Sequence, residues 1–263
     1  MGIIRKKNKK KTESPIDTTM SLGDHLEELR TRLIHIIVGL VITSGFCMLF
    51  GKYIIAFIRK PYIDAMGNEA ILQSLSPADG FVSYMQIALV CGVLLASPWI
   101  FYQLWKFVAT GLYPHEKRYV YASVPFSAGL FITGALFFIL GIAPVTLKFL
   151  VMFNKQFLGV SSNFTFANYI SFIGILTLIF GLAFQTPIAI FVLYITGLVS
   201  IRDFCKFRKY VFFGIVAISA AVLPGSDPFS LFAMVIPMYL LYELGILLSW
   251  FSERRKKKTL SDS

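Results

Sequence analysis

Long apolar runs dominate this chain and are separated by short polar segments. A transmembrane helix needs about 20 apolar residues, because each residue adds about 1.5 Å and the hydrocarbon core of a bilayer is about 30 Å thick. The runs therefore predict an all-α polytopic membrane protein with six transmembrane helices. Their approximate bounds are 33–58, 80–112, 120–153, 169–198, 210–223 and 229–251.

The last two of these helices are predicted to be short. The run from Tyr210 to Leu223 gives only about 21 Å of helix, and Pro224-Gly-Ser-Asp-Pro228 then turns the chain. Two arrangements fit this pattern: two short spans with local thinning of the bilayer, or a re-entrant hairpin. Both arrangements return the end of the chain to the side from which this segment entered.

Prolines are expected to shape the spans. The residue before a proline disfavours helix, so Arg59-Lys60-Pro61 is predicted to end the first span and to open an outer loop that reaches Asp79. Pro98 is expected to kink the second span. The third span contains Pro125 and Pro144, and the fourth contains Pro187.

Composition and charge support a membrane protein. Hydrophobic residues make up 56% of the chain and charged residues 15%, compared with about 45–50% and about 25% in soluble domains. The net charge is +11, but the basic residues lie beside apolar spans, which is typical of cytoplasmic loops and does not indicate a nucleic-acid partner. Both termini are therefore predicted to be cytoplasmic, and the terminal clusters are placed to contact anionic lipid headgroups. The clusters are Arg5 to Lys11, Lys117 with Arg118, Arg202 to Lys209 and Arg254 to Lys258.

The predicted organisation has three parts: a disordered basic tail (1–20), a six-helix transmembrane domain (21–251) and a basic tail (252–263). The first apolar run lacks the features of a cleavable signal peptide. The three cysteines have no disulfide or zinc spacing, so no metal or other cofactor is expected. No set of catalytic side chains is visible, which argues against an enzyme.

The stretch from Ser21 to Ile37 carries the first candidate site. Ser21 and Asp24 form a capping-box pattern, which predicts a helix start. Leucines lie on one stripe of this helix at positions 22, 26, 29 and 33, whereas His25, Glu28 and Arg32 lie on another face. A Glu28–Arg32 helix-surface pair contributes only about 0.2–0.5 kcal/mol. A simple surface pair is therefore one interpretation of Glu28.

A second carboxylate, Glu116, is expected at the same side of the membrane. Two separated carboxylates among basic residues could each take a guanidinium in a bidentate pair, so the expected ligand is an arginine-bearing peptide. The alternative is that Glu116 only balances Lys117 and Arg118.

Two polar side chains lie within the later spans. Ionisable residues in membranes are costly and often functional, so Glu243 is either a functional group or a structural one that reaches toward Arg254. Gln185 can join helices by hydrogen bonding, either inside this chain or with a partner helix. These groups are too few for a clear solute pathway, and the halves show no inverted repeat. A small secondary transporter or channel, an intramembrane enzyme and a purely structural scaffold remain as alternatives.

Several motifs, in a fixed order from about Ser21 to Phe251, resemble the family of the twin-arginine translocase C subunit (TatC). Any one of them is weak, but the ordered set on a six-span frame is specific. They are His25-Leu-Glu-Glu-Leu-Arg-Thr-Arg-Leu33, Ser97-Pro98 through Tyr102-Gln-Leu-Trp105, Phe107 to Tyr113-Pro-His-Glu-Lys-Arg118, Phe180-Gly-Leu-Ala-Phe184 with Pro187, and Ile236-Pro-Met-Tyr239 with Tyr242-Glu-Leu-Gly245.

The resemblance implies a receptor in a bacterial inner membrane that binds twin-arginine signal peptides of folded proteins and starts their export, driven by the proton gradient. It implies TatA-type and TatB-type single-span partners, which meet the fourth and fifth spans, and a homo-oligomeric complex. Glu28 and Glu116 would bind the twin arginines. Other residues that match family positions are Arg30, Phe107 and Tyr113 at that surface, and Pro61 and Asp227 on the outer side. Gln185 departs from a glutamate that many members carry, and Glu243 lies in a motif-like segment.

Overall fold

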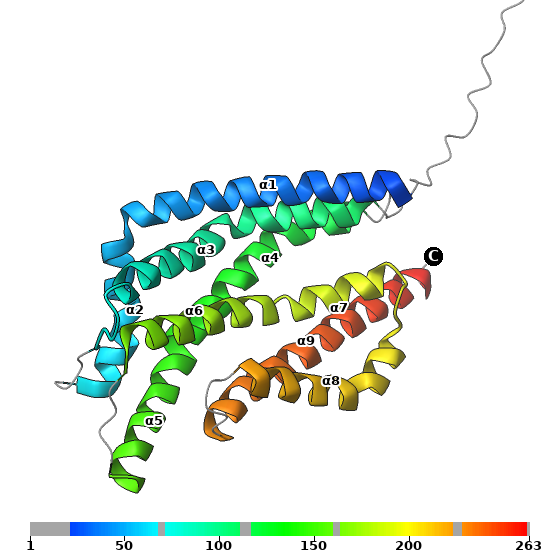
Figure 1. Ribbon diagram of the computed structural model, residues 1–263. Helices are drawn as coiled ribbons and strands as arrows, with labels where there is room; N and C mark the ends of the chain where they lie inside the picture. The colour runs from blue at the N-terminus through cyan, green and yellow to red at the C-terminus, as the bar shows by residue number, and fades with distance from the viewer. Residues whose placement is uncertain (1–21, 68–71, 111–116, 160–163, 223–227, 262–263) are drawn as a thin grey trace, which may run out of the picture.

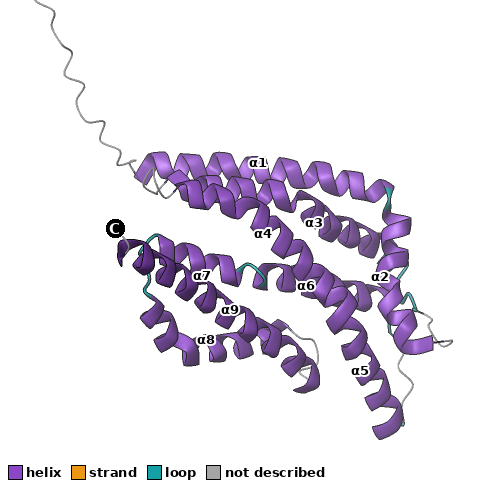
Figure 2. Ribbon diagram, turned by 180° about the vertical axis from the view of Figure 1, so that it is seen from behind, coloured by secondary structure: helices purple, strands orange, loops and turns teal. Residues whose placement is uncertain are grey.

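The structure, a computed structural model, describes residues 22–67, 72–110, 117–159, 164–222 and 228–261. These residues are almost entirely helical (Figures 1 and 2). Within the described segments, the only β-type pairing is an isolated bridge between Gln73 and Thr165. The helices are α1 (Leu22–Leu49), α2 (Gly51–Met66), α3 (Asp79–Thr110), α4 (Lys117–Phe137), α5 (Ala143–Phe157), α6 (Phe166–Ala183), α7 (Thr186–Ile195), α8 (Ile201–Val222) and α9 (Pro228–Ser261), and a π-helical turn (Phe138–Ile142) joins α4 to α5.

This architecture confirms the predicted all-α polytopic membrane fold. Five stretches of the described chain are long and apolar enough to cross a membrane: His25–Leu49, Asp79–Thr110, Tyr121–Phe157, Phe166–Ile195 and Leu231–Arg254. The fifth predicted span, 210–223, corresponds to the later part of α8, whose first two turns are basic. The final stretch has 24 residues, so of the last two helices only α8 has a short apolar part.

The bundle is built on α3. Helix α1 packs along α3, while α3 also contacts α4 and α6. Helices α7 and α9 pack together, and α8 packs mainly along α9. Figure 1 shows that α1 begins, and α3, α7 and α9 end, at one end of the bundle, which we call the amino-terminal end. Only 6% of the most apolar stretch of α1 is buried, compared with 44% in α3, so α1 is a peripheral helix.

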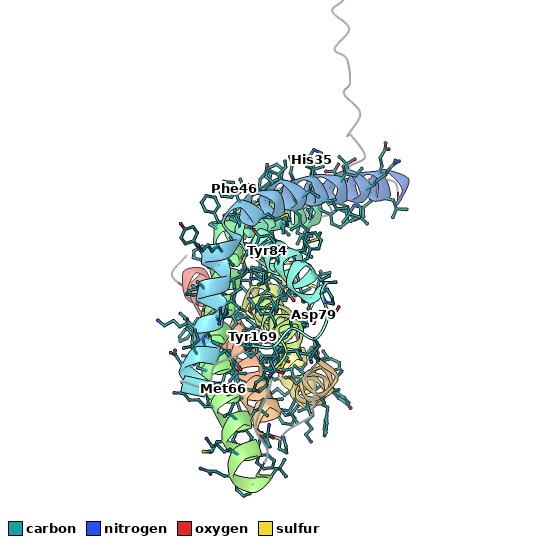
Figure 3. The ribbon with its side chains drawn as sticks, turned by 60° about the vertical axis from the view of Figure 1, so that its left-hand side comes forward. His35, Phe46, Met66, Asp79, Tyr84 and Tyr169 are labelled. Carbon is teal, nitrogen blue, oxygen red and sulfur yellow. The ribbon has the colours of Figure 1, made fainter. Side chains whose placement is uncertain are left out.

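The first span divides into two helices at Phe50. The hydroxyl of Tyr84, on α3, donates a hydrogen bond to the carbonyl of Met48, close to this break (Figure 3). A Cβ added to Gly51 would lie 2.3 Å from the Tyr84 ring, so a larger residue where α2 begins would require this ring to move. The predicted helix end at Arg59-Lys60-Pro61 is therefore wrong, because the chain turns earlier and α2 then runs on to Met66.

Pro61 lies inside α2 and is buried. A proline has no N–H for the carbonyl four residues before it, which weakens a helix. Packing compensates here, because Ile58, Pro61 and Tyr62 are all buried against the core. The hydroxyl of Tyr169, on α6, donates a 2.5 Å hydrogen bond to the carbonyl of Ile58 and fixes this turn of α2. Figure 3 shows Tyr169 between α2 and α6.

The third span continues beyond the thickness of a bilayer. Its apolar stretch Tyr121–Phe157 has 37 residues, or about 55 Å of helix. The π-helical turn lies in its middle, and Phe138 in this turn is fully buried and stacked on Phe180. Helix α5, with Pro144 in its first turn, extends with α2 past the end of the bundle opposite to the amino-terminal end (Figure 1).

The basic segment 202–209, predicted as a loop, is helical, because α8 begins at Ile201. A capping box explains this start. The Ser200 hydroxyl donates a 2.6 Å hydrogen bond to Asp203 Oδ2, and the Asp203 N–H donates to Ser200 Oγ at 3.3 Å. The bonds from the Ser200 hydroxyl and backbone N–H lower the pKa of Asp203. Helix α9 likewise continues to Ser261, through most of the predicted basic tail. The predicted disordered tail, 1–20, lies outside the described residues.

Candidate functional site

A polar network joins α1 to α3 at the amino-terminal end of the bundle. Arg32 donates to Glu28 Oε1 from both Nε, at 2.7 Å, and Nη2. Its Nη1 donates to Gln103 Oε1, on α3, at 3.1 Å. The side chains of Arg32 and Glu28 are 17% and 26% exposed, whereas Gln103 is buried. The predicted Glu28–Arg32 pair is thus confirmed, but it is also anchored to the neighbouring helix.

An aromatic stack lies one turn away from this network. The rings of His25 and Phe107 are stacked with their centroids 4.5 Å apart. His25 Nδ1 also lies 3.5 Å from the hydroxyl oxygen of Thr110, in the last turn of α3. Because His25 precedes Glu28 by three residues, the stack and the carboxylate lie on the same side of α1. The structure therefore brings two of the predicted site residues, Glu28 and Phe107, to one end of the α1–α3 pair.

Close packing of α1 on α3 sets the register of these residues. A Cβ added to Gly92 would lie 2.8 Å from the Cα of Ser44, so the two helices approach closely at this point. The hydroxyl of Thr43 donates a 3.0 Å hydrogen bond to the carbonyl of Gly92. Nearer the amino-terminal end, Trp99 Nε1 donates to the carbonyl of His35 at 2.9 Å. Small residues and such bonds are typical of helix contacts inside membranes.

The other residues predicted at this surface lie at different places. Arg30 is exposed on α1, about 160° around the helix from Glu28. Tyr113 and Glu116 fall in 111–116, between the end of α3 and the start of α4, and are outside the described residues. Asp227 is also outside them.

Glu243 is paired with a different arginine from the one expected. Its Oε2 accepts a 2.7 Å hydrogen bond from Arg208, on α8, and its Oε1 accepts a 3.0 Å bond from the hydroxyl of Tyr239. Arg254, the partner suggested by the sequence, instead lies 3.5 Å from the centroid of the Trp250 ring. The expected contact is wrong because a helix places Glu243 three turns from Arg254, while α8 packs directly beside it.

Gln185 joins helices within the chain. Its Nε2 donates a 3.0 Å hydrogen bond to the carbonyl of Ser127, on α4. Trp105, on α3, donates to the hydroxyl of the same serine at 2.8 Å. Gln185 lies in the break between α6 and α7, so this bond ties the broken fourth span to α4. Of the two roles predicted for its amide, internal packing is the one observed.

Among the described residues, no group of three or more His, Cys, Asp or Glu side chains is arranged to hold a metal ion. Cys47, Cys91 and Cys205 are free thiols.

Comparison with known proteins decides the family. Residues 24–237 match the profile of the family described as Sec-independent protein translocase protein (TatC). The chain belongs to the TatC family. It is 37% identical over 242 residues to the TatC of Aquifex aeolicus (strain VF5), covering 91% of this chain and 98% of that relative. It is 31% identical over 236 residues to the TatC of Escherichia coli (strain K12), covering 90% of each.

Solved TatC structures share the fold. A crystal structure of the twin arginine translocase receptor TatC in DDM superimposes with a TM-score of 0.77 at 36% identity, and the match covers 86% of this chain and 99% of that one. Family membership and the apolar helices make this chain a translocase component of a bacterial membrane, in place of the transporter, channel or enzyme alternatives.

The sequence interpretation missed two partners in this TatC-family chain, Gln103 and Arg208. Gln103 is a buried amide in the motif Tyr102-Gln-Leu-Trp105, and a lone amide in an apolar stretch was a usable signal. Arg208 was predicted to lie in a basic loop, and that prediction gave no reason to expect a contact with Glu243.

Proposed function

We propose that this TatC-family protein is a receptor for the twin-arginine signal peptides of folded proteins. It binds them at the amino-terminal end of the bundle, which faces the cytoplasm of a bacterium, and both termini lie on that side of the inner membrane. Glu28 and Glu116 each receive one arginine side chain of the peptide.

The pairing of Glu28 with Arg32 is the observation that carries this proposal. Nε and Nη2 of the Arg32 guanidinium both bond Oε1 of Glu28, so this carboxylate already binds a guanidinium within the chain. A lysine ammonium cannot place two donors of one plane on a carboxylate as a guanidinium does. The partial exposure of Glu28 leaves it accessible from outside the bundle.

Neighbouring groups support the same site. The stacked rings of His25 and Phe107 provide a planar surface beside Glu28, and guanidinium groups pack well on aromatic faces. The segment 111–116 connects Thr110, which lies next to His25, to the start of α4. We include Tyr113 and Glu116, which follow Thr110 in the sequence, in the proposed site. Arg30, which is exposed on another face of α1, is proposed to line the same surface of the protein.

We further propose that peptide binding nucleates a translocation site with TatA-type and TatB-type single-span subunits and further copies of this chain, powered by the proton gradient. We propose that three further residues act in this assembly: Glu243, Pro61 and Asp227. Gln185 contributes through packing, since its amide is bonded to α4.

A binding experiment tests the receptor proposal. The purified chain in nanodiscs is titrated with a fluorescent signal peptide that carries Arg-Arg and with its Lys-Lys variant. The Arg-Arg peptide should bind at least about tenfold more tightly, since charge-assisted hydrogen bonds contribute about 1.5–3 kcal/mol each. Glu28→Gln and Glu116→Gln should each remove most of this preference.

Glu27→Gln is the matched control. Glu27 is the exposed neighbour of Glu28, so its substitution makes the same charge change one position along α1 and should leave the preference intact. Equal binding of both peptides to the unchanged protein, or equal effects of the Glu27 and Glu28 substitutions, would show that these carboxylates do not form the receptor site.

A further inference from the structure

The outer face of α8 carries a row of cations. Arg202, Lys206 and Lys209 are four and three residues apart, so they lie within about 60° of one another on the helix. All three side chains are exposed. Asp203 is the acidic residue of this turn, and its carboxylate accepts from Ser200. Arg208 points elsewhere, toward Glu243 on α9.

Two hydrogen bonds show which part of α9 this row lies beside. Arg208 bonds Glu243 at 2.7 Å, and the Tyr242 hydroxyl bonds the carbonyl of Phe204 at 2.7 Å. The basic turns of α8 therefore lie beside the turn of α9 that contains Glu243. The row therefore lies beside an ion pair of α9, on the turns of α8 that come before its apolar part.

Cations next to an apolar segment attract a counter-charge. Lysine and arginine side chains at such a border extend toward lipid headgroups. Asp203, the acidic residue of α8 beside this row, supplies one negative charge against the three positive charges of the row. An anionic group from outside the chain complements this face.

The same face becomes apolar one turn further along α8. Phe213 follows Lys209 by four residues and is 70% exposed. The ring of Tyr210 lies 5.9 Å from that of Phe207, and both side chains are exposed beside the row. A row of cations followed by an apolar surface matches a molecule with an anionic head and a hydrocarbon tail. An acidic protein segment would match only the first part.

We propose that the outer face of α8 is a binding site for an anionic phospholipid. Arg202, Lys206 and Lys209 hold its phosphate, and its acyl chain lies along Phe213. This site is separate from the Glu28 site and does not depend on signal-peptide binding.

Lipid retention tests the proposal. The full chain is reconstituted in vesicles of phosphatidylcholine and phosphatidylglycerol in equal amounts, extracted in detergent and washed, and the retained lipids are counted by mass spectrometry. The unchanged protein should retain about fivefold more phosphatidylglycerol than phosphatidylcholine, which corresponds to about 1 kcal/mol. The triple variant Arg202→Gln, Lys206→Gln, Lys209→Gln should retain the two lipids equally.

A second triple variant controls for net charge. Lys52→Gln, Lys60→Gln and Lys148→Gln remove three exposed cations from α2 and α5 and should leave the fivefold preference unchanged. Lys206→Gln alone, which changes the centre of the row with the least effect on folding, should at least halve the preference. The proposal is overturned if the unchanged protein shows no preference, or if both triple variants lose it equally.

Discussion

Arg32 bonds Glu28 through two nitrogens of its guanidinium, so the carboxylate proposed to receive a peptide arginine already holds an arginine of its own chain. The third nitrogen of Arg32 reaches Gln103 on α3. A peptide guanidinium must therefore share Glu28 with Arg32 or displace it toward Gln103. If Glu28 receives the peptide as proposed, Arg32 is an internal competitor for the site.

This competition predicts the effect of removing Arg32. In Arg32→Gln, Glu28 loses its internal partner, and the affinity for an Arg-Arg peptide should rise by about tenfold, the equivalent of one charge-assisted hydrogen bond of about 1.5 kcal/mol. Fluorescence titration in nanodiscs measures this affinity. Arg30→Gln, which removes an exposed arginine two residues away, should not raise it. Weaker peptide binding by Arg32→Gln would mean that Arg32 positions Glu28 instead of competing for it.

The contact between α1 and α3 predicts a contrast between two glycines. In Gly92→Ala the new Cβ would press on the backbone of Ser44, so we expect a loss of about 1–3 kcal/mol in the free energy of unfolding. Gly45→Ala, on α1, meets no atom within 4 Å and should gain up to about 1 kcal/mol from helix propensity. Denaturant unfolding in detergent measures both. Similar effects of the two substitutions would contradict the close approach of α1 and α3.

The stabilising effect of Gln185 should depend on the N–H group that its side-chain amide donates. Gln185→Leu loses the bond to the Ser127 carbonyl, at a cost of about 0.5–1.5 kcal/mol in unfolding free energy. Gln185→Glu should cost more at neutral pH, because a carboxylate has no hydrogen to donate to a carbonyl. Thr133→Val is the control, since the hydroxyl of Thr133 bonds only within its own helix, to Gly129. A fully stable glutamate variant would show that the bond to Ser127 does not hold the fourth span.

The pair between α8 and α9 can be measured by a double-mutant cycle. Arg208→Gln, Glu243→Gln and the double variant should give a coupling energy of about 1 kcal/mol, the upper part of the range for partly exposed ion pairs. Tyr239→Phe should also weaken the protein, because its hydroxyl donates to Glu243. Lys206→Gln, on the outer face of α8, should show no coupling with Glu243→Gln. A coupling energy near zero would show that the Arg208–Glu243 pair does not hold α8 against α9.

The sequence predicted the elements well where the signal was local. The apolar runs predicted the spanning helices, and the four-residue spacing of Glu28 and Arg32 predicted their pair. Pro61 was misleading because a proline only disfavours helix locally, whereas the packing of Ile58 and Tyr62 in the core determines whether α2 continues.

Contacts between helices could not be read from local patterns. Arg208 and Glu243 are 35 positions apart, and only the packing of α8 along α9 brings them together. Gln103 meets Arg32 across 71 positions for the same reason. The break at Phe50 depends on Tyr84 of another helix, so the adjacent Gly51 was the only local sign of it.

The order in which the chain is made gives the α8–α9 pair a further consequence. Arg208 emerges during synthesis before Glu243, and α8 packs mainly along α9. Until α9 has been made, α8 has a short apolar segment, an unmatched arginine and little to pack against. We therefore expect α8 to stay at the membrane surface until α9 inserts, so that the last two helices enter the membrane as one unit.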